Sequence, residues 1–449
     1  MRTQMRAPAR VTLVALLSVA ATGLVATAAQ ASATDIKINE VESSGGSPGD
    51  WVELTNTGAS TVDVSGWIIK DNDNAHSYTI AASTTIAPGA FRAFDVETSY
   101  GLGAADSARV FQPDGTTLID SYTWTSHAST TYGRCVDGTG SFVTTNGATK
   151  GAANSCPGTT WPGGSSVSTA DNTNAFGTNL SGLTYESSTV AWAVKNGAST
   201  LYRLVPSGSL WVADSGAWAS GKGLRYASGS GDPDAEGVVA TERDNNNSGT
   251  SLLKVLRYDT AASGSTLNAT AEWNLTSDLP SVAANSGLEA ISWVPDSALT
   301  AAGFVDENTG TAYSSSTYSN HGGGLYFVGL EANGVIYAYA LNQSGTTYTR
   351  VATITSGFAG VMDLEYESST GKLWAACDDT CSGQTKTFSV NGSGHFAATA
   401  TYLRPSGMSN YNNEGFALSP TCSGGVKQVL WADDSNDSSH ALRSGTLTC

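Results

Sequence analysis

Four glutamates recur along the second two thirds of this 449-residue chain, each at the start of a short apolar run. They are Glu236, Glu289, Glu365 and Glu414, and Thr184 stands at a fifth such start. From Thr184 onward the successive spacings are 52, 53, 76 and 49 residues. Carboxylates gathered at one place can bind a hard cation, and calcium accepts about six to eight oxygen ligands in flexible geometry. The chemistry therefore depends on whether the fold brings these carboxylates together.

A repeat of this length accommodates one four-stranded sheet, and arrays of such sheets close into β-propellers. The sequence predicts a propeller of five or six blades over 165–449. The long third interval, 289–365, contains the low-complexity stretch 309–320, which is either an insertion or a sixth, degraded blade. In a closed ring the repeated glutamates would converge at one mouth of the channel.

The register of the hairpins tests this convergence. Folding the fourth repeat about its turn at 368–371 places Glu365 opposite roughly Ala376, so that Asp378 returns to the same rim. Crowded carboxylates repel one another, and a bound cation relieves that repulsion. In the alternative interpretation, each glutamate caps its blade by accepting backbone N–H bonds. The predicted calcium ligands are the four repeated glutamates and two returning aspartates: Glu236, Glu289, Glu365, Glu414, Asp378 and Asp433.

The first 33 residues have the pattern of a cleaved secretory signal. Arginines precede the apolar stretch 11–25, and the segment ends in the small-x-small sequence Ala31-Ser32-Ala33. This apolar stretch is shorter than the roughly 20 residues that a membrane span needs, and no later segment is apolar enough. The sequence thus predicts a secreted, extracellular protein without a membrane span.

Charge excludes some classes of partner. The formal net charge is −17, and removal of the three arginines in the signal makes it about −20. Such a protein is not expected to bind nucleic acid or anionic lipid, because that binding relies on lysine and arginine. Charged residues make up only 14% of the chain and glycines number 50. With short alternating apolar runs, this composition is typical of an all-β chain with many turns.

The six cysteines fit an oxidising compartment. Sequence alone permits 15 pairings, and proximity favours Cys135–Cys156, Cys377–Cys381 and Cys422–Cys449. A metal site is the weaker interpretation of the Cys-x3-Cys pair, because structural zinc needs four ligands.

The stretch 157–164 is rich in proline and glycine and predicts a linker between two domains. The preceding domain, 34–156, has the size and strand spacing of a β-sandwich. Its ordered motifs resemble the lamin tail domain family, which implies an immunoglobulin-like sandwich that accompanies another domain. Within these motifs Glu40 and Glu53 could form a site, but a solvated or hydrogen-bonded role is the favoured interpretation. The motifs are Ile36-Lys37-Ile38-Asn39-Glu40-Val41, Asp50-Trp51-Val52-Glu53-Leu54-Thr55-Asn56, Val64-Ser65-Gly66-Trp67, Ile86-Ala87-Pro88-Gly89 and Leu118-Ile119-Asp120-Ser121-Tyr122.

The repeats resemble the phytase-like and esterase-like propeller families, most closely at Asp232-Pro233-Asp234-Ala235-Glu236-Gly237. The resemblance implies calcium held by rim carboxylates, some of which assist phosphoester hydrolysis. Whether the protein is an enzyme stays open, and three functions are predicted. The first is an extracellular binding or scaffold role, with a protein or polymer partner on the lamin tail domain. The others are a calcium-dependent phosphoesterase or esterase, and a carbohydrate-active propeller.

Overall fold

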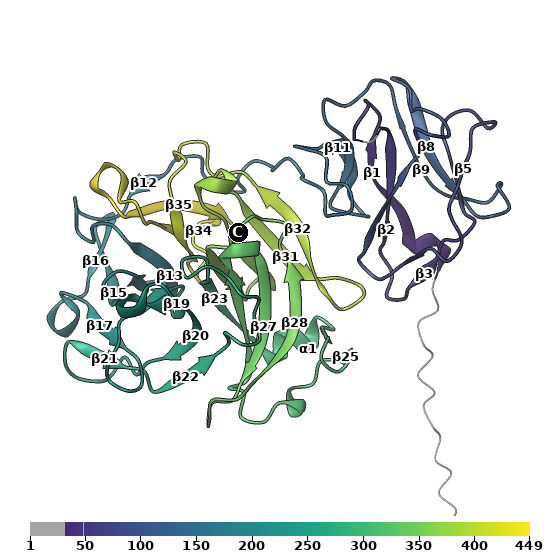
Figure 1. Cartoon of the computed structure of the whole chain (residues 1–449). Coiled ribbons are helices and arrows are strands. Elements are labelled where there is room, and N and C mark those ends of the chain that lie inside the picture. Colours follow the sequence, from purple (N-terminus) through teal and green to yellow (C-terminus); the bar gives the residue numbers. More distant parts are fainter. Residues whose placement is uncertain (1–31, 48) are drawn as a thin grey trace, which may run out of the picture.

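The computed structural model describes residues 32–47 and 49–449, and the regular secondary structure of this part of the chain is mostly β-strand (Figure 1). The predicted all-β class is confirmed. The predicted signal peptide, 1–33, lies outside the described residues except for its last two positions. Among the residues that are described, no helix is long and apolar enough to cross a membrane.

The first region consists of two main antiparallel sheets and a small two-stranded one. In sheet order, the larger sheet contains β11 (Ser141–Thr144), β10 (Tyr132–Cys135), β1 (Ile36–Glu42), β2 (Trp51–Asn56) and β7 (Phe91–Asp95). The second contains β5 (Tyr78–Thr79), β4 (Ile68–Lys70), β8 (Asp106–Phe111) and β9 (Leu118–Trp124). The small sheet pairs β3 (Val62–Asp63) with β6 (Thr85–Ile86), and a 3-10 turn, η1 (Ala33–Asp35), precedes β1.

Apolar side chains of these sheets share one core, because alternate residues of each strand face inward. The residues predicted for this core from the motifs, Trp51, Leu54, Trp67 and Ile69, are all buried. Their burial confirms these four residues as core residues. The hairpin of β10 and β11, which follows the motifs, extends the larger sheet through pairing of β10 with β1.

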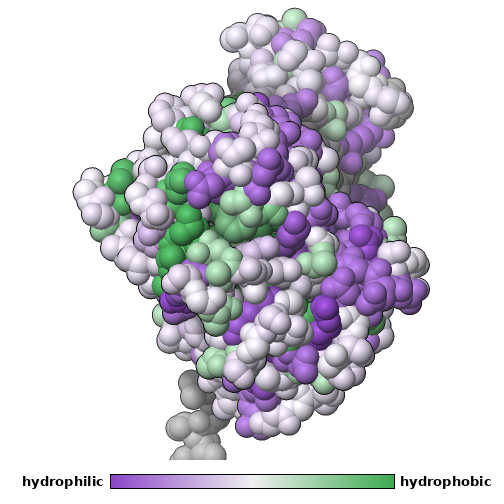
Figure 2. Space-filling view, turned by 90° about the vertical axis from the view of Figure 1, so that its left-hand side faces the viewer, coloured by the Kyte–Doolittle hydropathy of each residue, from purple (hydrophilic) through white to green (hydrophobic). Residues whose placement is uncertain are grey.

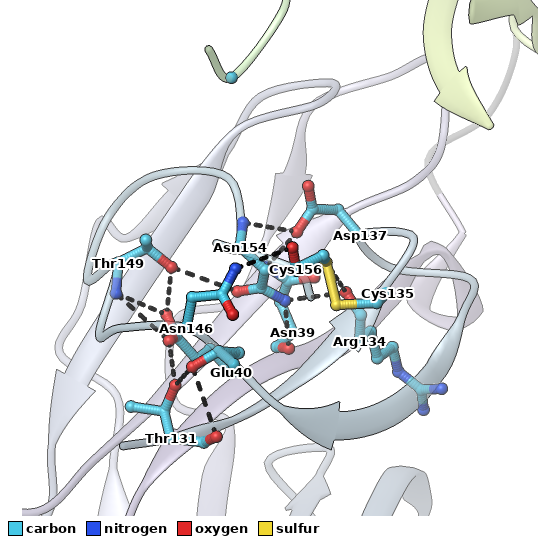
Figure 3. The surroundings of a disulfide bond; sticks show 12 residues. Asn39, Glu40, Thr131, Arg134, Cys135, Asp137, Asn146, Thr149, Asn154 and Cys156 are labelled. Carbon is cyan, nitrogen blue, oxygen red and sulfur yellow. Dashed lines mark hydrogen bonds between the residues drawn. A yellow bond between two sulfur atoms is a disulfide. The ribbon is translucent and has the colours of Figure 1, made fainter. Parts of the chain in front are cut away.

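Three acidic side chains, Glu40, Glu53 and Asp137, are held by the segment 145–156, here called the strap. Figure 3 shows Glu40 and Asp137 with their strap partners Thr149 and Asn154. Strap groups that donate to them are the Thr149 hydroxyl (2.8 Å to Glu40), the Gly151 amide (2.5 Å to Glu53) and the Asn154 amide (3.0 Å to Asp137). The Asn39 amide nitrogen donates to both Glu53 and Asp137. The hydrogen-bonded role predicted for Glu40 and Glu53 is therefore confirmed.

The second region contains five main sheets, each built mostly from strands that follow one another along the chain (Figure 1). The first contains β13 (Leu180–Ser187), β14 (Val190–Lys195), β15 (Thr200–Ser207), β17 (Lys222–Arg225) and β21 (Thr266–Asn268), with β16 (Leu210–Ala213) paired to β15. The second contains β18 (Pro233–Glu236), β19 (Ala240–Asp244), β20 (Ser251–Arg257) and β22 (Ala271–Asn274). The third contains β23 (Leu288–Pro295), β26 (Gly324–Leu330), β27 (Val335–Leu341) and β28 (Tyr348–Thr355).

The fourth sheet contains β29 (Asp363–Glu367), β30 (Lys372–Ala376), β31 (Thr385–Val390) and β32 (Phe396–Tyr402). The fifth contains β33 (Asn413–Leu418), β34 (Val426–Asp433), β35 (Leu442–Thr448) and β12 (Ser168–Thr169), so the start of this region completes a sheet made by its end. The first strands contact one another in the cyclic order β13, β18, β23, β29, β33 and back to β13. Within the described part of the chain, no single sheet closes on itself.

The long third interval, 289–365, contains an insertion between β23 and β26. It contains α1 (Asp296–Ala301), the small hairpin of β24 (Val305–Asp306) and β25 (Thr311–Ala312), and the 3-10 turn η4 (Ser315–Thr317). The other short 3-10 turns are η2 (Gly216–Trp218), η3 (Asn245–Asn247), η5 (Glu331–Asn333), η6 (Asp379–Cys381) and η7 (Asp437–Ser439).

The segment predicted as a linker, 157–164, is anchored on the second region. Trp161 is buried among Trp374, Phe416 and Trp431, and its indole N–H donates to the carbonyl of Thr446 at 2.8 Å. The predicted disulfides Cys135–Cys156, Cys377–Cys381 and Cys422–Cys449 are all confirmed. The last bridge ties the C-terminal residue to the loop between β33 and β34.

Figure 2 shows the face of the second region that lies at the left in Figure 1. Residues of intermediate hydropathy cover most of this face, with scattered hydrophilic groups and one hydrophobic strip. This mixed surface agrees with a composition of 50 glycines and 14% charged residues.

Candidate metal centre

Three of the predicted ligands, Glu236, Glu289 and Glu414, meet at one place. They lie at the end of β18, near the start of β23 and near the start of β33. One carboxylate oxygen from each lies within 4.8 Å of the others. The structure therefore brings together residues that are up to 178 positions apart (414 minus 236) in the chain.

The strand pairing is irregular at two of the glutamates that meet, Glu289 and Glu414. The pairing register shifts between Leu288 and Ala290 and again between Asn413 and Gly415, so Glu289 and Glu414 are the extra residues of two β-bulges. A bulge bends its strand and changes where a side chain points. Both glutamates are thereby released from the regular alternation of their strands.

Small residues after the glutamates let the first strands approach one another. A Cβ atom on Gly237 would lie 2.8 Å from the backbone nitrogen of Ile291, and one on Gly415 would lie 2.3 Å from the Ser181 carbonyl oxygen. Neither distance is compatible with a larger residue, because the obstructing atoms belong to the backbone. The Glu-small pair thus positions the carboxylate and closes the contact between neighbouring sheets.

Burial dominates the electrostatics of this cluster. The side chains of Glu236 and Glu289 are almost fully buried, and burial raises the pKa of each carboxyl well above its usual value. Neighbouring negative charges add to the effect, Glu242 most for Glu236 and Glu236 most for Glu289. Burial, then Glu236 and Asp434, likewise raises the pKa of Glu414.

Further acids adjoin the three glutamates. Glu242, in the middle of β19, is buried and forms a second close group with Glu289 and Glu331, and a third with Asp234 and Glu236. Burial raises the pKa of Glu331 to about 7 and that of Asp234 to about 6. Arg243 pairs with Asp234 at 2.6 Å and opposes the shift at that residue.

Several buried oxygens of this acid cluster have no hydrogen-bond partner among the described residues. They are Oε2 of Glu236, Oε2 of Glu331 and Oε2 of Glu414. Buried polar atoms are nearly always hydrogen-bonded, and an unmet acceptor costs about 1–3 kcal/mol. Oxygen donors of this kind suit hard cations such as calcium. The residues present therefore fit the cation that the sequence predicts.

Glu365 lies outside this cluster. The predicted register of its hairpin is wrong by two residues, because Glu365 pairs with Trp374 and Asp363 pairs with Ala376. Burial raises the pKa of Glu365, whose charged neighbours are Asp363, Glu367 and Lys427. Asp363 instead faces the adjoining sheets, where its carboxylate accepts the backbone N–H groups of Phe416 and Leu183.

The two predicted aspartates have other partners. Asp433 forms a buried ion pair with Arg443 at 3.3 Å, and its neighbour Asp434 is the residue whose charge acts on Glu414. Asp378 accepts hydrogen bonds from the amide and hydroxyl of Thr380 and caps η6. Its charge nevertheless contributes to the raised pKa values of Glu331 and Glu414.

Ser181, not Thr184, occupies the fifth position. Gly182 packs against Gly237, and the Ser181 carbonyl packs against Gly415, which aligns Ser181-Gly182 with Glu236-Gly237. A small residue directly after the acid marks the three glutamates that meet, whereas the bulky Tyr366 follows Glu365. The small residue after each acid could have identified, from the sequence, the three glutamates that meet. Glu242 and Glu331, omitted from the predicted ligands, lie within β19 and directly after β26.

Comparison with known proteins identifies the first region. Residues 29–126 match the lamin tail domain family. The matched range ends before β10, so the hairpin of β10 and β11 and the strap follow the matched part of the lamin tail domain. No family match confirms the predicted phytase-like or esterase-like second region, and no curated protein matches the chain.

Three solved structures show distant likeness, each with a TM-score of 0.27. A nidogen/laminin complex is 9% identical, and the match covers 59% of this chain and 83% of that chain. A protein of unknown function from Bacteroides thetaiotaomicron is 10% identical, with coverage of 91% and 94%. A protein from Lactobacillus plantarum is also 10% identical, with coverage of 92% and 96%. Likenesses this distant carry no functional argument.

Proposed function

We propose that this protein is a secreted binding or scaffold protein in which a lamin tail domain is followed by a calcium-binding, five-bladed β-propeller. The proposed boundaries are 34–156 for the sandwich and 165–449 for the propeller, with 157–164 between them. The lamin tail domain would bind an extracellular protein or polymer. The acid cluster of the propeller would hold the ion through Glu236, Glu289 and Glu414.

The propeller is supported by the cyclic order of the five first strands and by the strand β12, which joins the fifth sheet. Such a joint between the two ends of a region restrains the ring against opening. Secretion is supported by the three disulfides, which persist in oxidising compartments. The absence of a membrane-spanning helix among the described residues is compatible with it.

One observation carries the calcium proposal: Glu236 and Glu289, both buried, and the partly buried Glu414 come from three sheets and place oxygens within 4.8 Å of one another. Oε2 of Glu236 and of Glu414 lacks a partner among the described residues. Calcium–oxygen distances are about 2.3–2.6 Å, so oxygens up to about 5 Å apart can share one ion. A cation would satisfy the free oxygens and reduce the repulsion among the carboxylates.

Thermal unfolding in calcium and in chelator tests this proposal. Calcium at 100 times its dissociation constant is expected to stabilise the folded protein by about 2.7 kcal/mol. For a region of about 285 residues (165–449) that corresponds to a rise in Tm of roughly 4–5 °C. Glu236→Gln should abolish most of the rise, and the exposed-site control Glu186→Gln should retain it. Equal melting temperatures in calcium and chelator would contradict the proposal.

A further inference from the structure

The acid cluster is larger than the set that one ion can use. Glu289 belongs to two close groups: one with Glu236 and Glu414, the other with Glu242 and Glu331. In each group, one oxygen from every member lies within 4.8 Å of the others. Glu414 and Glu331 are not members of the same group. Glu289 therefore lies between two separate sets of oxygens.

Each set has the dimensions of a coordination sphere. Oxygens bound to one calcium ion lie about 2.3–2.6 Å from it, and hence no more than about 5 Å from one another. Both groups meet this limit. A single ion near Glu414 would leave Glu331 without a ligand role, since those two glutamates do not share a group.

Unmet hydrogen-bonding capacity occurs in both sets. Oε2 of Glu414 and Oε2 of Glu236, a side chain with only 2% exposure, lack partners in the first set. In the second set, Oε2 of Glu331 is buried and also lacks a partner within the described chain. The Gly287 amide donates to Oε1 of Glu242, and the Glu242 carboxyl also interacts with the side chain of Glu289. One ion would satisfy the first set and leave the oxygen of Glu331 unpaired.

The charge of the acid cluster also favours two bound dications over one. The three close groups contain six carboxyls, Asp234, Glu236, Glu242, Glu289, Glu331 and Glu414. Arg243 balances Asp234 through their ion pair, which leaves five carboxyls. With all five ionised, one dication leaves a net charge of −3 and two leave −1. An uncompensated charge is costly in a buried environment, so the second ion removes most of the remaining cost.

We propose that the acid cluster binds two calcium ions, with Glu289 as the bridging carboxylate, Glu236 and Glu414 on one side, and Glu242 and Glu331 on the other. This inference rests on the proposed calcium site and adds a second ion with its own ligands. The two sites would fill as coupled steps, because they share Glu289. Adjacent metal ions in proteins are typically about 3.5–4 Å apart, a separation that a bridging carboxylate allows.

Calorimetric titration of the calcium-free protein with calcium chloride counts the ions. The wild-type protein is expected to bind two per molecule. Glu331→Gln should lose the second site alone and bind one, Glu414→Gln should lose the first and bind one, and Glu289→Gln should bind neither. The matched control Glu186→Gln changes an exposed acid outside the cluster and should still bind two.

The outcomes separate the two proposals. One calcium per wild-type molecule, unaltered by Glu331→Gln, overturns the second site and leaves the first in place. No calcium bound to the wild-type protein overturns both. Circular dichroism checks that each variant is folded, and Glu331→Asp, which keeps the charge on a shorter side chain, should bind a second ion more weakly. Anomalous diffraction from lanthanide-soaked crystals should show two peaks bridged by Glu289, and a single peak would contradict the inference.

Discussion

Buried carboxyls occur in both regions of the molecule, and the two groups differ in how their oxygens are used. In the first region, Glu40, Glu53 and Asp137 accept hydrogen bonds from the strap, as Figure 3 shows for Glu40 and Asp137. In the second region, Glu236 and Glu414 each retain a buried oxygen without a partner among the described residues. Burial raises the pKa of the carboxyls in both places.

This difference shows that a raised pKa does not by itself mark a binding site. Burial shifts the pKa of a carboxyl whether or not its oxygens are occupied. What distinguishes the second region is unmet hydrogen-bonding capacity among acids from different sheets. The strap carboxyls are accordingly structural. This assignment can be tested by measuring how each region responds when a hydrogen-bond partner or a charge is changed.

Removal of a partner in the lamin tail region should have the largest effect. Asn39→Ala deletes the amide that donates to Glu53 and Asp137 and that accepts the Gly138 N–H at 2.8 Å. Buried groups left without partners cost about 1–3 kcal/mol each, so we expect a loss of about 2–4 kcal/mol in the free energy of unfolding. Urea denaturation measures it. Asn74→Ala, at an exposed position of the same region, is the control, and equal stabilities of the two variants would contradict a structural role for the network.

The sequence predicted the β-strands of both regions more reliably than it predicted where individual side chains point. The predicted strands, the disulfides and the meeting of Glu236, Glu289 and Glu414 depend on alternation, proximity and repeat spacing, which are local or periodic signals. The error at Glu365 came from a register shift of two residues. Likewise, Asp433 and Asp434 are adjacent, and only the fold shows that Asp433 pairs with Arg443 while Asp434 acts on Glu414.

The strap network should respond to pH with a definite sign. Burial raises the pKa of Glu53 from 4.5 to about 8, so the folded state keeps a proton that the unfolded chain releases near pH 4.5. The resulting stability is fully present below about pH 4.5 and is lost as the pH rises through about 8. Each pH unit within this window changes the free energy by up to about 1.4 kcal/mol.

Hydrogen exchange over 145–156 measures this dependence, after correction for the intrinsic effect of pH on exchange. The free energy of strap opening should fall between pH 5 and pH 8. Glu53→Gln carries no titrating group at this position and should give a shallower slope. An opening free energy that is constant or rises over this range would show that Glu53 is ionised in the folded protein.

The smallest effect is expected where a charge is removed from the second region, and its sign should be opposite to that of Asn39→Ala. In Glu414→Gln, the side-chain carbonyl can still accept from Asn412, while the new amide N–H groups point towards the acidic neighbours Glu236 and Asp434. An unpaired acceptor is thereby replaced by a donor among acceptors, and one repelling charge is removed.

We expect the calcium-free variant to be about 1 kcal/mol more stable than the wild-type protein in urea denaturation with chelator, and to gain less from added calcium. Glu186→Gln should lie within about 0.5 kcal/mol of wild type under both conditions, as is usual for a surface change. If Glu414→Gln instead destabilises the calcium-free protein, its carboxylate has a structural partner, and the contrast between the two regions is wrong at this residue.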